Sequence, residues 1–158
     1  MRLETTRFGA LEIDGESVLT LTQPIIGFPH LRRFMLLPGP PGSAVKWLQS
    51  TEAGDVAFLL MDPRAVIPAY AVDLRAEELA ELAVKSPAEL EVYTLLVVPA
   101  DPAHIRTNLK APLLINPVQR LGKQTILDRK DYPIQHFLVP GGQEAETPEE
   151  AAHARTDA

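Results

Sequence analysis

The chain has 158 residues, a formal net charge of −6 and no cysteine. This length suits a single domain, and the lack of cysteine excludes a disulfide framework and thiolate chemistry. No apolar run approaches the ~20 residues of a membrane helix, and charged residues interrupt the first 15 positions, which excludes a signal peptide. We therefore expect a soluble cytoplasmic protein.

Charge is distributed unevenly along the chain. Residues 141–158 hold five carboxylates and one arginine, so −4 of the net −6 lies there and −2 is left for residues 1–140. An almost neutral body lacks the basic face that phosphate binding requires, so we expect no direct binding to nucleic acid. Protein partners are the more natural expectation.

Short β-rich runs, separated by 15 prolines and 9 glycines, are typical of an all-β sandwich or barrel. In the first half of the chain we predict strands over residues 18–21, 33–37, 45–50 and 56–61. The Pro-Gly-Pro-Pro-Gly tract at 38–42 is predicted to be a loop, because proline cannot donate to a sheet.

One helix is predicted in the middle of the chain. Asp73 is a competent N-cap, positions 76, 79, 80 and 83 form an apolar helical stripe, and Lys85 follows near the C-terminal end. Glu77 and Glu78 occupy adjacent positions that do not face each other, which predicts a solvated helix face rather than an acid/base pair.

The second half of the chain is again rich in β signals. We predict single helical turns at 86–89 and 101–104, and strands over 92–98, 112–115, 124–127 and 134–139. The stretch 122–125, Gly-Lys-Gln-Thr, lacks the other residues of a phosphate-binding loop and is interpreted as a β-turn with a basic tip. The expected fold is mainly β, a small closed or pseudo β-barrel of antiparallel strands with one short helix.

A boundary is predicted near Pro140, so that residues 1–140 form the barrel domain and residues 141–158 a flexible acidic tail, disordered when unbound. Thr147 to Glu150 nevertheless has the spelling of a capping box, followed by alanines that favour a helix. Two alternatives stay open, a tail that folds on a partner through Glu149 and Glu150 and a tail that only solubilises.

Few residues suggest catalysis or cofactor binding. The four histidines, at 30, 104, 136 and 153, lie far apart without metal-ligand spacing, and no nucleophile motif is present. We therefore expect no enzyme activity, no metal and no cofactor. A barrel that binds a small molecule is an alternative, and it would require a measurable internal cavity.

Several polar and aromatic residues are candidates for partner contacts. Alternation places Trp47 and Gln49 on one face of a strand and Ser50 on the other. Core packing is the default for Trp47 and an exposed interface anchor the alternative. Gln49 and Ser50 suit either a turn closure or the docking of another backbone, and Tyr70 suits either the core or the surface.

Three further candidates have simple local roles available. Asp62 precedes a proline and is expected to cap the turn that ends a strand. Asn108 and Asn116 flank an apolar run bracketed by prolines, which suits an edge strand with two amide-to-backbone caps.

Two phrases of the sequence are distinctive: Lys-Trp-Leu-Gln-Ser at 46–50 with Ala-Phe-Leu-Leu-Met-Asp-Pro at 57–63, and Thr-Asn-Leu-Lys-Ala-Pro-Leu-Leu-Ile-Asn at 107–116. They resemble the FliW family of bacterial flagellar assembly factors. Further landmarks extend the resemblance over residues 5 to about 139: Phe8, Gly9, Gly27, Phe28, Tyr70, 97–99, 124–127 and Tyr132. Two departures are Leu-Thr-Gln-Pro at 21–24 and Arg7, which stands where the family commonly has an aromatic residue.

The resemblance implies a monomeric β-barrel binder with two alternative partners, flagellin and the RNA-binding regulator CsrA, which it antagonises. Flagellin export would then be coupled to flagellin translation. A flagellin-specific chaperone without a CsrA role is a further alternative. The residues assigned to partner binding are Trp47, Gln49, Ser50, Asp62, Tyr70, Asn108, Asn116, Glu149 and Glu150.

Overall fold

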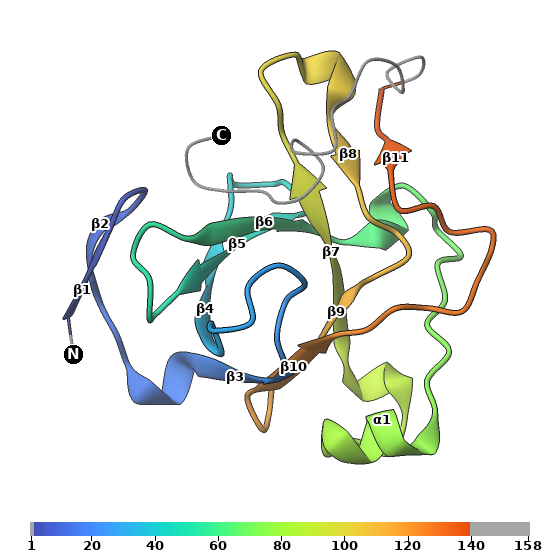
Figure 1. The fold of residues 1–158 in the computed structure, drawn as a ribbon, viewed down its shortest axis with the longest axis horizontal. Coiled ribbons are helices and arrows are strands. Elements are labelled where there is room, and N and C mark those ends of the chain that lie inside the picture. The colour runs from blue at the N-terminus through green and yellow to red at the C-terminus, as the bar shows by residue number, and fades with distance from the viewer. Residues whose placement is uncertain (1, 140–158) are drawn as a thin grey trace.

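The computed structural model describes residues 2–139 and is built mainly of short strands (Figure 1). It contains one α-helix, and four single 3-10 turns lie in the connections. In chain order the elements are β1 (Arg2–Thr5), β2 (Gly9–Glu12), η1 (Gly15–Ser17), β3 (Val18–Gln23), β4 (Arg33–Pro38), β5 (Val45–Ser50), β6 (Ala57–Met61), η2 (Pro63–Ala65), α1 (Ala76–Glu81), η3 (Pro87–Glu89), β7 (Glu91–Val97), η4 (Pro102–His104), β8 (Arg106–Thr107), β9 (Leu113–Asn116), β10 (Leu121–Gln124) and β11 (His136–Phe137).

Seven strands form a closed barrel in the order β7-β6-β5-β4-β3-β10-β9, because β9 pairs back onto the first half of β7. Strands β8 and β11 extend the sheet from the second half of β7. Every barrel pair is antiparallel except β3–β10, in which Leu121 lies opposite Thr20. The predicted barrel is confirmed, with this one parallel pair as a difference. The parallel pair is formed by β3 and β10, which are the first and last barrel strands in chain order and are therefore not linked by a hairpin.

The barrel interior is filled by apolar side chains that alternate along the strands with outward-facing residues. The aromatic side chains of this interior pack around Phe58. The centroid of its ring lies 4.9 Å from that of Phe28, in an edge-on arrangement, and 6.0 Å from that of Phe34. The buried residues of this cluster are Leu19, Leu21, Ile25, Phe34, Leu48, Val56, Phe58, Leu60, Tyr93, Leu113 and Ile115.

A second apolar core lies outside the barrel, where α1 and residues near 127–132 cover β7 and β9. It consists of Tyr70, Leu82, Val84, Leu90, Val92, Leu109, Leu114, Leu127 and Tyr132. Strand β9 therefore buries Leu114 on one face and Leu113 and Ile115 on the other. The expectation of an edge strand at 112–115 is wrong, because β9 has β7 and β10 as neighbours.

A separate hairpin, β1–β2, packs against the outside of the barrel and has no counterpart among the sequence predictions. The Thr6 N–H donates to Gly54 O at 3.0 Å. A Cβ at Gly54 would collide with the Glu4 carbonyl, so the close approach of the hairpin requires glycine there.

Most predicted strands are observed, and the two single turns are η3 and η4. The helix differs from the prediction. Its N-cap is Arg75, whereas Asp73 lies outside the helix with its carboxylate 3.7 Å from the guanidinium of Arg129. Ala83 adopts a φ of 59°, which ends the helical stripe before Lys85.

Two strand predictions are displaced or shortened. The strand predicted at 124–127 is β10, three residues earlier, because the preceding turn closes at Arg120, whose φ is 59°. The Arg120 N–H donates to Asn116 O at 2.9 Å, so a strand can begin at Leu121. The last strand covers His136–Phe137 instead of 134–139, since its partner β8 has two residues. No helix among residues 2–139 is long and apolar enough to cross a membrane.

Candidate functional site

Trp47 lies on the outer face of β5, half-buried beneath the tip of the β1–β2 hairpin. The Phe8 ring meets the Trp47 ring edge-on at 5.7 Å, and the guanidinium of Arg7 lies 4.3 Å from its centroid. The barrel interior is occupied instead by the neighbouring Leu48. Trp47 is therefore neither a residue of the barrel core nor a fully exposed interface anchor. Phe8 and Arg7 cover part of its ring, and the rest of the side chain stays partly exposed.

Gln49 and Ser50 close the turn between β5 and β6, and both are fully buried. Nε2 of Gln49 donates to Ser50 O at 2.9 Å and Val56 O at 3.1 Å. Oγ of Ser50 accepts from the backbone N–H groups of residues 52 and 53 at 3.1 and 2.9 Å. Of the two roles that the sequence allowed, the structure places these residues in turn closure.

Asp62, Asn108 and Asn116 accept hydrogen bonds from backbone N–H groups that follow them, as the sequence predicts. Oδ1 of Asp62 accepts from the N–H of residue 64 at 2.9 Å, and Oδ1 of Asn108 accepts from the N–H of residue 110 at 3.0 Å. Asn116 is buried, and its Nδ2 also donates to Leu82 O at 2.8 Å, which ties β9 to the end of α1.

Tyr70 is buried in the second core, stacked on Tyr132 with ring centroids 4.5 Å apart. Its hydroxyl donates to Leu109 O at 2.6 Å. Burial, together with the neighbouring Tyr132, raises the pKa of the Tyr70 phenol far above its ordinary value, so the group stays a neutral donor. The core alternative holds for this residue.

The seven predicted residues within 2–139 do not converge on one site. Gln49, Ser50, Tyr70 and Asn116 are buried, so a partner could reach their side chains only after local opening. Glu149 and Glu150 lie outside the described residues. As partner contacts, all nine stay a prediction.

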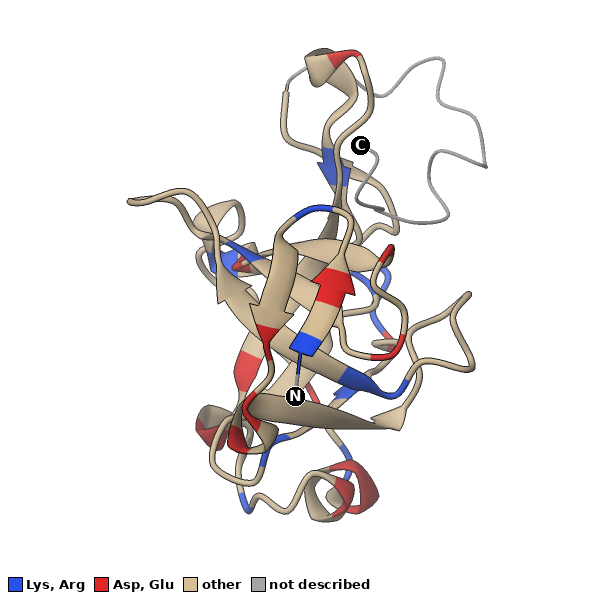
Figure 2. Ribbon diagram, turned by 90° about the vertical axis from the view of Figure 1, so that its left-hand side faces the viewer, with Lys and Arg blue, Asp and Glu red and all other residues tan. Residues whose placement is uncertain are grey.

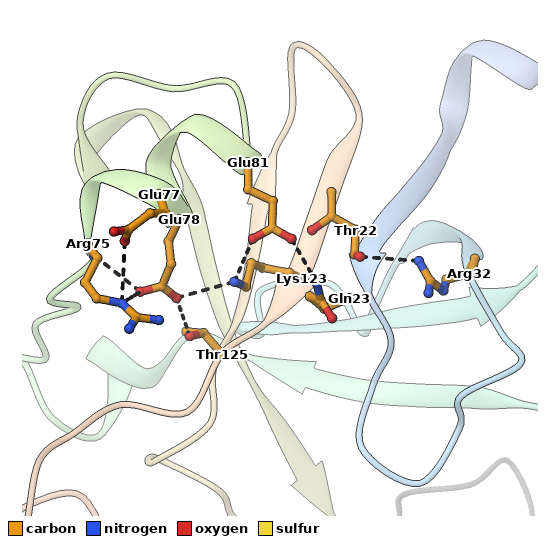
Figure 3. Close-up of polar contacts among 9 residues, drawn as sticks. All are labelled: Thr22, Gln23, Arg32, Arg75, Glu77, Glu78, Glu81, Lys123 and Thr125. Atoms are coloured by element: carbon orange, nitrogen blue, oxygen red, sulfur yellow. Dashed lines mark hydrogen bonds and ion pairs between the residues drawn. The ribbon is translucent and has the colours of Figure 1, made fainter.

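A cluster that the sequence did not predict joins β10 to α1 (Figure 3). Nζ of Lys123 lies 2.9 Å from a carboxylate oxygen of Glu81 and 3.4 Å from one of Glu78. Thr125 donates its hydroxyl to the same oxygen of Glu78 at 2.6 Å. Lys123 and Glu78 each keep about 10% of their side-chain surface exposed. The predictions of a basic turn tip at Lys123 and of a solvated Glu78 are therefore wrong.

The electrostatics of this cluster favour charged carboxylates. Burial alone would raise the pKa of Glu78, but the Thr125 hydroxyl, the backbone N–H of Arg75 and the charge of Lys123 outweigh it and lower the pKa. The pKa of Glu81 is lowered in the same way, with burial opposed chiefly by the Lys123 hydrogen bond. Both glutamates are thus held as ions that neutralise a buried lysine.

A groove of about 670 Å³ lies beside this cluster, outside the barrel. Its lining combines the buried polar groups of β10 and α1 with exposed apolar side chains from the loop after β3 and from the segment after β10. The lining residues are Gln23, Pro24, Ile25, Ile26, Gly27, Pro29, Arg75, Glu78, Lys123, Gln124, Thr125 and Ile126. The sequence gives no local sign of this groove, because its walls come from three distant parts of the chain.

The arrangement suits binding better than chemistry. Glu78 and Glu81 already share Lys123, and Thr125 is engaged as a donor to Glu78, so none is poised as an acid, base or nucleophile. Residues 2–139 contain no group of three or more His, Asp or Glu side chains that could hold a metal ion. The groove is therefore a candidate binding site.

Comparisons with known proteins identify the family. A model described as FliW protein matches residues 2–138. A flagellar assembly factor FliW of Moorella thermoacetica is 43% identical over 139 residues, covering 87% of this chain and 88% of the relative. One from Desulfitobacterium hafniense is 36% identical over 149 residues, covering 94% and 98%. A crystal structure of the flagellar assembly factor FliW superposes with a TM-score of 0.80 at 31% identity, covering 89% of this chain and 98% of the other. The resemblance is confirmed, and the chain belongs to the FliW family of flagellar assembly factors.

Proposed function

We propose that this chain binds flagellin and, in alternation, binds and antagonises the translational regulator CsrA. When flagellin is exported, the released factor would sequester CsrA, so that flagellin translation resumes. The observation that carries this proposal is the family match over residues 2–138, with relatives named as flagellar assembly factors.

Features of the described residues are consistent with a protein-binding role in the cytoplasm. The lysine and glutamates of the buried cluster neutralise one another instead of presenting a reactive group. In the view of Figure 2, the basic and acidic positions are interspersed along the ribbon. We accordingly propose a non-catalytic monomer that contacts CsrA itself and not RNA.

The experiment is size-exclusion chromatography of the purified chain with CsrA, with flagellin and with both. We expect two binary complexes and no ternary one. A ternary peak would contradict alternation, binding to flagellin alone would indicate a chaperone without a CsrA role, and no complex with either partner would contradict the proposal as a whole. Fluorescence anisotropy with a flagellin leader RNA should show no binding by this chain alone.

We further propose that residues 141–158, including Glu149 and Glu150, dock on a basic face of CsrA. The segment carries −4 of the net −6 charge. Truncation after Pro140 should leave flagellin binding intact and weaken CsrA binding by about 1 to 3 kcal/mol. Affinities at two ionic strengths test this, since acidic contacts fade with salt. Equal CsrA affinity with and without the tail would return these residues to a solubilising role.

A further inference from the structure

We draw no further inference here: the strongest candidate, the apolar groove beside β10 that Ile26 and Ile126 line, is an unpartnered surface whose charged lining residues already pair with one another, and nothing in the structure shows what covers it.

Discussion

Replacing Lys123 by methionine tests whether the buried ion cluster holds α1 to the barrel. The substitution keeps an unbranched apolar stem and removes the ammonium group, which lies 3.4 Å from Glu78 and 2.9 Å from Glu81. Breaking a buried ion pair by removing one partner costs about 3 to 5 kcal/mol, because the other charge stays buried. Glu78 keeps its bond from Thr125, and Glu81 keeps 27% of its side-chain exposure. We therefore expect the lower end, about 3 kcal/mol.

The assay is urea unfolding followed by circular dichroism, with Lys130→Met as the control because Lys130 is exposed. The control should change the free energy of unfolding by less than about 0.5 kcal/mol. The double variant Lys123→Met with Glu78→Gln should recover part of the loss, since it no longer buries an unpaired carboxylate beside the methionine. A loss below about 1 kcal/mol for Lys123→Met, or no recovery in the double variant, would refute the reasoning.

The same cluster sets a pH dependence: the pKa of Glu78 is lowered from its ordinary value of 4.5, so its stabilisation is present above that value and lost as pH falls through the lowered pKa. The cost of Lys123→Met, measured by unfolding at a series of pH values, should accordingly shrink below about pH 4.5. Phe8→Ala should shift the fluorescence of Trp47, the single tryptophan, to longer wavelength by uncovering its ring, and unchanged emission would mean that the hairpin does not dock there. Asn116→Ala should cost about 2 to 3 kcal/mol in urea unfolding, because it leaves Leu82 O buried without its donor and removes the cap of the following turn. Retention of full stability in this variant would show that the Leu82 carbonyl finds another donor.

Local signals predict much of the barrel because they do not depend on distant neighbours. The run 45–50 alternates and is bounded by turn residues, and β5 has those bounds. Asp62 and Asn108 cap their own following residues, so their roles can be derived from the sequence alone. Ser86 caps η3 in the same way, as the capping-box spelling indicates.

The prediction of a turn at Lys123 fails because a contact with a distant part of the chain determines where this residue lies. Lys123 follows a glycine and resembles a turn tip in isolation, but its charge is neutralised by α1, 42 residues earlier in the chain. Gly122 is needed inside the barrel, where a Cβ would lie 3.1 Å from Leu114 O and from the side chain of Leu21. The turn is instead made by the residues between Asn116 and Arg120. The positions of Gly122 and Lys123 in the sequence therefore give no sign that Lys123 pairs with α1.

The groove inherits its rigidity from the alternation of side chains along β10 and just beyond it. Lys123 and Thr125 both contact Glu78 on α1. The side chain of Gln124, between them, points the other way, where it accepts from the Ile26 N–H and donates to Ala111 O. Three consecutive residues thereby fix both walls of the groove before any partner arrives. A preformed surface loses less conformational entropy on binding than one that must be ordered. Substitutions at Lys123 should therefore displace α1 and change the shape of the groove, even though its ammonium group is almost fully covered.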